Sequence, residues 1–407
     1  MAVTIAAQQP FLSEVGSRPS VRELISRAEE IGRLARDRAV ETERNRQVSA
    51  DMVQRMRDAD LFRIMQPRAF GGFEYGYDVF VEAVAAIGAG DGSTGWVYSL
   101  GAVHQWLIGC YPLEAQQEVW GDDDNAISAV SYAPVGKVVE ENGAYRISGR
   151  WSFMSGIDNA QWGILGAIIP FPTGPKPGFL LVPKKDYVIE DDWNPMGLAG
   201  TGSKSVVIAD VIVPKYRAVS FAEVLVGAGP GTKVNTNPLY RQPMLAVVPN
   251  CLVSPALGMA RGALSAFVEQ VSGRTTRGAV AGGNNRMAEF VTIQSRVAEA
   301  TACIDAATLM IHRDLRETAE RIENGDEVDV DMRIRNRLTH SFAVRMLTQA
   351  VDAVFTAAGG SALGLNHPVQ RFWRDIHAVS SHISLNWDAV SAMYGQHAFG
   401  LEPKGQY

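Results

Sequence analysis

Apolar residues recur at helical spacing through the first 120 residues. Ser20 and Glu23 have the spacing of a capping box, directly ahead of an apolar series that runs from Leu24 to Leu34. Similar patterns, with Pro112 at the start of the last helix, predict further helices over about 49–62, 77–90, 96–110 and 112–120. We therefore expect an N-terminal helical domain over residues 1–121.

The hydrophobic period changes near residue 126. Short apolar runs, separated by Gly, Pro and Asn, predict strands over 126–132, 135–140, 145–153, 162–169, 178–182, 187–191, 205–209 and 211–213. Asn142 and Gly143 can adopt the positive φ values of a type I′ turn, which predicts a β-hairpin there. The pattern is typical of an antiparallel sandwich or barrel, so we expect a central antiparallel β-domain over 122–230.

Long helical patterns return after residue 250. They predict helices over about 251–272, 286–323, 331–358 and 367–397, much longer than the average globular helix. Helices of this length need partners along their whole length, in a bundle or in other subunits. We therefore expect an α+β protein that ends in a C-terminal helical bundle over 231–407.

Composition narrows the function classes. The net charge is −6 and no Lys/Arg block is present, which argues against a nucleic-acid partner. The cysteines, Cys110, Cys251 and Cys303, lie in apolar segments, as expected of thiols in a reducing compartment, and no Cys/His spacing suggests a metal site. No basic leader or spanning apolar segment is evident, so we expect a soluble cytoplasmic protein without a membrane partner.

Familiar catalytic motifs are missing. Gly227, Gly229 and Gly231 approach a dinucleotide fingerprint, but Pro230 interrupts them and no βαβ pattern surrounds them. An enzyme of this sequence would need a cofactor or scattered catalytic residues.

The stretch from Gly143 to Asn159 has a distinctive composition. Its aromatic-rich second strand ends in Ser155 and Gly156, so a flat ring could approach the backbone while the hydroxyl offers a hydrogen bond. An ordinary hairpin with a buried tryptophan, Trp151, would have the same pattern.

Four motifs resemble one family in their order along the chain. They are the strand end Trp-Ser-Phe-Met-Ser-Gly over 151–156, the loop Gly-Leu-Ala-Gly-Thr-Gly-Ser over 197–203, Arg-Phe-Trp-Arg-Asp-Ile-His over 371–377, and His382. Together with the α-β-α order, they resemble the acyl-CoA dehydrogenase fold, and more closely its branch of two-component flavin-dependent aromatic hydroxylases. The similarity extends from about residue 20 to residue 400.

The resemblance implies an oxygenase component. It would take reduced flavin, FMNH2 or FADH2, from a separate NAD(P)H:flavin reductase by diffusion, react with O2 to form a flavin C4a-hydroperoxide, and hydroxylate a phenolic or indolic ring. Ser155 would lie beside flavin N5, and His382 would manage protons by titrating near neutral pH. Trp151, Phe153, Thr201, Ser203 and Arg277 would bind the cofactor, with Arg274 as an equally near alternative to Arg277. The family also implies a homotetramer.

Substrate contacts follow from the same resemblance. His104 and Ser131 match a pair that holds a phenolic hydroxyl in the family, and Trp106 and Tyr132 would form pocket walls. A lone histidine in an apolar helix is, however, also a common core residue.

Two departures from the related proteins matter. Ala199 replaces an arginine of related phenol hydroxylases, which favours a neutral phenol or indole over an aryl acid; otherwise Arg217 or Arg241 would capture a carboxylate. The chain also lacks a glutamate at the base position of acyl-CoA dehydrogenases, near His382. A dehydrogenase with tightly bound FAD and a scaffold that binds no flavin remain alternatives.

Overall fold

The computed structural model describes residues 18–275 and 286–407, and its N-terminal part is helical. The helices are α1 (Val21–Asn45), α2 (Ala50–Asp58), α3 (Tyr77–Gly88), α4 (Gly92–Gly109) and α5 (Leu113–Trp120). The Ser20–Glu23 capping box is confirmed. The helix predicted over 49–62 is shorter, because Asp60 adopts a positive φ of 59° and starts a separate 3-10 turn. Asp91 caps α4 four residues earlier than expected.

The central part is a seven-stranded sheet in the order β5-β6-β2-β1-β3-β4-β7. The strands are β1 (Ser128–Glu141), β2 (Ala144–Met154), β3 (Trp162–Phe171), β4 (Gly174–Pro183), β5 (Val188–Glu190), β6 (Lys204–Pro214) and β7 (Ala218–Ser220). Asn142 and Gly143 have φ values of 50° and 80°, which confirms the predicted hairpin. Sequence reasoning missed β7 and divided both β1 and β6 in two.

One strand pair corrects the antiparallel prediction. β1 and β3 run parallel, while the other pairs of the sheet are antiparallel. The register of the parallel pair shifts between Ser131 and Gly136, so β1 pairs with β3 in its first half and with β2 in its second half. β1 packs against α4, and His104 of α4 is bonded to Ser128 at the start of the strand.

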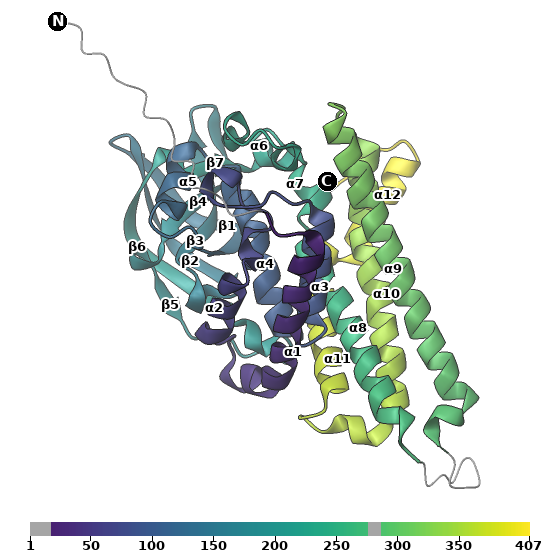
Figure 1. Cartoon of the computed structure of the whole chain (residues 1–407). Helices are drawn as coiled ribbons and strands as arrows, with labels where there is room; N and C mark the ends of the chain where they lie inside the picture. The colour runs from purple at the N-terminus through teal and green to yellow at the C-terminus, as the bar shows by residue number, and fades with distance from the viewer. Residues whose placement is uncertain (1–17, 276–285) are drawn as a thin grey trace, which may run out of the picture.

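Long helices follow the sheet and form the opposite side of the molecule (Figure 1). The long ones are α8 (Asn250–Ser272), α9 (Val291–Glu323) and α10 (Val330–Ala358), followed by the shorter α11 (Pro368–Ser380) and α12 (Trp387–Ala398). Two short helices precede them, α6 (Phe221–Leu225), which packs against β4 and β7, and α7 (Met244–Val247). The continuous helix predicted over 367–397 is wrong. The side chains of His382 and Asn386 accept backbone N–H groups at the break, and the 3-10 turn η11 (Ile383–Leu385) separates α11 from α12.

Two helices form the centre of the core. Every residue of α4 is buried, and α8 packs against α3, α4, α10 and α11. The stretch Met244–Ser272 is long and apolar enough to cross a membrane, but 72% of its apolar window is buried inside the fold. Its hydrophobicity is therefore explained by its place in the core.

Candidate active site

Ser155 follows the end of β2, where the backbone is unusual. Phe153 has a φ of 63°, which is strained for a residue with a side chain, and its ring is 72% exposed. Gly156 has a φ of 74°, and its N–H donates to the Thr201 carbonyl at 2.9 Å. Backbone strain of this kind clusters at active sites and ligand sites, so the end of β2 is a candidate ligand site.

A chain of hydroxyl groups connects Ser155 to the loop over 197–203. Ser155 Oγ lies 2.7 Å from Ser203 Oγ, and Ser203 Oγ lies 2.6 Å from Thr201 Oγ1. Thr201 Oγ1 donates its hydrogen to the Leu198 carbonyl at 2.8 Å. The structure thus brings three of the predicted residues together.

The directions of these hydrogen bonds are fixed by counting hydrogens. Thr201 donates its single hydrogen to a carbonyl, so Ser203 donates to Thr201 and Ser155 donates to Ser203. Ser155 Oγ also accepts from Trp96 Nε1 at 3.1 Å. In this arrangement one lone pair of Ser155 remains, so Ser155 is set to accept a hydrogen bond from a ligand.

His382 lies close to the same tryptophan. The centroids of the Trp96 and His382 rings are 6.1 Å apart, and Trp96 Nε1 donates to Ser155, so Trp96 lies beside both residues. The Ser384 N–H donates to His382 Nδ1 at 3.2 Å, which places the hydrogen of the neutral imidazole on Nε2. Burial, and then the charge of Arg337, lower the pKa of His382 to about 4. His382 is neutral at pH 7, which corrects the prediction that it titrates near neutral pH.

Asp375 supports the loop from α11. Its Oδ1 accepts the Leu198 N–H at 2.6 Å, and Leu198 has a positive φ of 55°. Burial, followed by the nearby charge of Asp91, raises the pKa of Asp375 to about 7. This carboxyl group therefore fixes the backbone conformation from which the hydroxyl chain starts.

His104 carries its ring hydrogen on the opposite nitrogen from His382. Its Nδ1 lies 2.8 Å from the Ser128 carbonyl, so Nδ1 carries the hydrogen and Nε2 is an acceptor. The side chain has no exposure, and Nε2 has no hydrogen-bond partner among the described residues. Burial lowers the pKa of His104 to about 4, so the ring is neutral.

One face of α4 connects the two histidine regions. Trp96, Leu100 and His104 are four residues apart along the helix and share a face. With a rise of about 1.5 Å per residue, Trp96 and His104 are separated by about 12 Å along the axis. The helix can thus present a cofactor contact near one end and a substrate contact near the other.

The remaining predicted substrate residues are scattered. Ser131 is buried on β1. The residue of that strand to which His104 bonds is Ser128. The Tyr132 ring meets the edge of Phe179 at 5.3 Å. Trp106 is fully buried and donates to the Leu239 carbonyl at 2.8 Å, so its contacts are those of a core residue.

Not all of the predicted cofactor residues lie near Ser155. Trp151 lies fully buried inside the sheet, where its Nε1 donates to the Gly166 carbonyl at 2.8 Å, so it is not grouped with Ser155. Arg277 lies outside the described residues. Its alternative, Arg274, donates to Ser361 Oγ at 2.7 Å near the end of α10.

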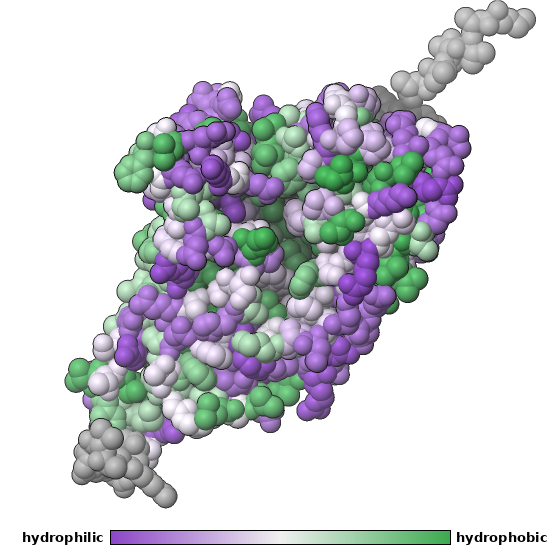
Figure 2. All heavy atoms as spheres, turned by 180° about the vertical axis from the view of Figure 1, so that it is seen from behind, coloured by the Kyte–Doolittle hydropathy of each residue, from purple (hydrophilic) through white to green (hydrophobic). Residues whose placement is uncertain are grey.

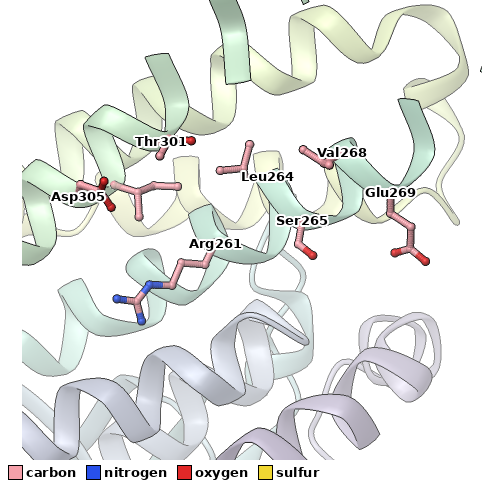
Figure 3. Close-up of a pocket in the computed structure, with 8 residues that line it drawn as sticks. Arg261, Leu264, Ser265, Val268, Glu269, Thr301 and Asp305 are labelled. Atoms are coloured by element: carbon pink, nitrogen blue, oxygen red, sulfur yellow. The ribbon is translucent and has the colours of Figure 1, made fainter. Parts of the chain in front are cut away.

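A cleft of about 300 Å³ opens beside Phe153 and Ser203. Its lining includes Trp193, whose ring meets the Phe153 ring edge at 6.1 Å. From behind, the surface is hollowed between the side of the strands and the side of the long helices, with hydrophobic residues inside the hollow (Figure 2). A larger and more open groove of about 630 Å³ lies between α8 and α9, away from Ser155, with Arg261 and Asp305 among its lining residues (Figure 3).

Comparisons with known proteins match this geometry. Residues 20–122 match the acyl-CoA dehydrogenase N-terminal domain and residues 250–387 match its C-terminal domain. The chain is 46% identical to the oxygenase component of an FADH2-dependent resorcinol hydroxylase from Rhizobium, over 96% of this chain and 97% of that protein.

Solved structures agree with the sequence comparison. The crystal structure of a 3-HSA hydroxylase from Rhodococcus has a TM-score of 0.89 and 34% identity, covering 94% of this chain and 98% of that chain. XiaF from Streptomyces, in complex with FADH2 and glycerol, has a TM-score of 0.87 and 28% identity, covering 95% of this chain and 97% of that chain.

The fold is therefore that of acyl-CoA dehydrogenases. Within it, the chain belongs to the oxygenase components of two-component flavin-dependent aromatic hydroxylases. It is a monooxygenase that uses reduced flavin and O2 on aromatic substrates, and it requires a separate reductase. The dehydrogenase and scaffold alternatives are not supported.

Proposed function

We propose that Ser155 and His382 are the catalytic contacts to the flavin. Reduced flavin carries an N–H group at N5, whereas N5 of oxidised flavin is an acceptor. Ser155 has only an acceptor lone pair left for a ligand, so it fits the reduced form. Neutral His382 offers its Nε2–H to the same site, and the bound flavin supplies the oxygen chemistry.

Phe153, Thr201 and Ser203 complete the cofactor side of this proposal. The exposed Phe153 ring offers a flat apolar surface, and the two hydroxyls fix the direction of the Ser155 hydrogen bond. FADH2 is the flavin named for the 46% identical relative, so we propose it for this enzyme. A reductase would deliver it by diffusion in the cytoplasm.

We propose that the substrate is a neutral phenol of the resorcinol type. The observation that carries this proposal is the buried acceptor Nε2 of His104, which has no partner among residues 18–275 and 286–407 and suits a hydroxyl hydrogen. Ser131 and Tyr132 remain the accompanying proposals on β1. Ala199, in the short helical turn η5 (Ala199–Thr201), provides no charge for a carboxylate, and the relative at 46% identity is a resorcinol hydroxylase.

A substrate panel tests this proposal. The purified enzyme would receive FADH2 from any flavin reductase, together with resorcinol, phenol, indole, indole-3-acetate or 4-hydroxyphenylacetate. We expect the neutral phenols to be hydroxylated with the highest kcat/KM. Turnover of carboxylated rings alone would contradict the proposal and make Arg217 or Arg241 the candidates for carboxylate binding.

We also propose a homotetramer. Large apolar side chains remain exposed on the C-terminal part, among them Leu309 at 72%, Ile383 at 85% and Phe399 at 85%. Contact with further copies would remove this apolar surface from water. Light scattering that returned an active monomer near 44 kDa would contradict a tetramer.

A further inference from the structure

Arg337 of α10 is a buried cation with an unusual set of partners. The residue lies in the interior, with only 6% of its surface exposed. Its Nη2 donates to the Ser384 carbonyl at 2.9 Å, whereas Nε and Nη1 have no partner among the described residues. Within residues 18–275 and 286–407, no carboxylate forms an ion pair with it. A buried, unpaired charge is costly to keep, so its position calls for an explanation.

The contacts of Arg337 converge on the turn that carries His382. Arg337 Nη2 donates to the Ser384 carbonyl, and the Ser384 N–H donates to His382 Nδ1. Ser341, four residues further along α10, donates to the Leu385 carbonyl at 2.8 Å and anchors the same turn. The peptide groups of one short turn therefore connect Arg337 to the orientation of the His382 ring.

We propose that Arg337 is a positioning residue that keeps His382 neutral, oriented, and with its hydrogen on Nε2. Protonation of His382 would place a second positive charge near Arg337 and would set Nδ1–H against the Ser384 N–H, with loss of that hydrogen bond. His382 therefore remains a donor through Nε2. This inference rests on the flavin contact proposed for His382 above.

The other charged and titratable surroundings are consistent with this role. His340 also lies near Arg337, and burial followed by the Arg337 charge holds its pKa well below the usual value. Its Nε2 lies 3.1 Å from Asn250 Nδ2 of α8, which requires Nε2 to accept. Trp96 of α4, whose ring centroid lies 6.1 Å from that of His382, carries no charge. Arg337 is thus the charged group that acts on His382 among the described residues.

Histidine NMR on the flavin-free protein tests the proposal. The chain has seven histidines, and loss of one signal in His382→Gln assigns the resonance. In the wild type, the nitrogen shifts should show the hydrogen on Nε2 of His382 and no titration near pH 7. In Arg337→Gln, we expect the titration midpoint of His382 to rise by up to about one pH unit, because burial, the larger cause of the lowered pKa, remains.

Two further variants separate charge from general disturbance. Arg337→Lys keeps the charge, so the midpoint should stay low. Arg345→Gln removes an exposed charge from the same helix, where Arg345 lies 4.5 Å from the centroid of the Trp387 ring, and should leave the midpoint unchanged.

Two results would overturn the inference. One is a hydrogen on Nδ1 of His382 in the wild-type protein, which needs no variant to fold. The other is an equal midpoint in the wild type and a folded Arg337→Gln. Neither result depends on turnover. By contrast, a His382→Gln enzyme with normal coupling of O2 to product would overturn the proposed role of His382 itself.

Discussion

The two ends of the α4 face that carries Trp96, Leu100 and His104 differ in how their polar groups are hydrogen-bonded. Near Trp96, the polar groups of Ser155, Ser203 and Thr201 bond to one another, and their hydrogens point in one direction. Near His104, one buried acceptor is left without a partner among the described residues. The cofactor end is organised by the protein, whereas the substrate end is completed by the substrate.

This difference separates two uses of hydrogen bonding. Preorganised donors and acceptors can stabilise charge that develops during the reaction without being rearranged. An unpartnered buried acceptor instead penalises a ring that lacks a donor, because the acceptor then remains unsatisfied. We therefore expect the Ser155 end to control coupling of O2 to product and the His104 end to control substrate choice.

The largest expected effect concerns the substrate end. A ring of the same shape that lacks the O–H or N–H donor should lose about 10⁴-fold in kcat/KM, because His104 Nε2 would stay unpaired. Competition kinetics with matched rings would measure this. In His104→Leu the difference should shrink by at least tenfold, and equal discrimination in both enzymes would remove His104 from substrate recognition.

The next effect concerns the cofactor end. Ser155→Ala should release hydrogen peroxide about a hundredfold faster, since one positioned hydrogen bond in such a site contributes about 2–4 kcal/mol. The ratio of product to O2 consumed, followed by stopped-flow oxidation, measures this leak. Ser155→Thr keeps the hydroxyl and serves as the control. A leak of equal size in both variants would point to packing rather than to the hydroxyl.

A smaller effect is expected from Asp375. Its pKa is raised from 3.8 to about 7, so the folded protein holds this proton more tightly than the unfolded chain. Its contribution to stability is complete below about pH 4 and is lost as the pH rises through about 7. Between pH 5 and pH 8, the wild type should therefore lose about 2 kcal/mol of unfolding free energy relative to Asp375→Asn. Denaturant titrations with parallel pH profiles would contradict this.

The smallest effect should come from Trp96→Phe. The phenyl ring can still lie beside His382, but the N–H donor to Ser155 is removed. Loss of one hydrogen bond of this kind changes free energies by about 0.5–1.5 kcal/mol, so coupling should fall by tenfold at most. A loss as large as in Ser155→Ala would mean that Trp96 has a further role.

Much of the fold could be predicted from the hydrophobic period, because the long helices and the hairpin at Asn142 follow local patterns. The break at His382 could not, since helical spacing continues through it and only side-chain capping ends α11. The parallel pairing of β1 with β3 depends on how distant strands meet, which no local signal encodes. The domain boundaries at residues 121 and 230 remain predictions.

The site was less visible in the sequence than the fold. Ser155, Thr201 and Ser203 were identified through the family resemblance, but the direction of their hydrogen bonds depends on the Leu198 carbonyl. Trp96 looked like an ordinary apolar helix residue. Asp375 had one available signal, a carboxylate within a motif of a largely buried helix, but its bond to Leu198 joins residues far apart in sequence.

Ser155 is proposed to select reduced flavin by accepting a hydrogen bond from it. Anaerobic dissociation constants for reduced and oxidised FAD, in the wild type and in Ser155→Ala, test it directly. We predict that the wild type prefers reduced flavin and that this preference falls about tenfold in Ser155→Ala, which corresponds to about 1.4 kcal/mol. A wild type that binds oxidised flavin at least as tightly, or an unchanged ratio in the variant, would contradict the claim.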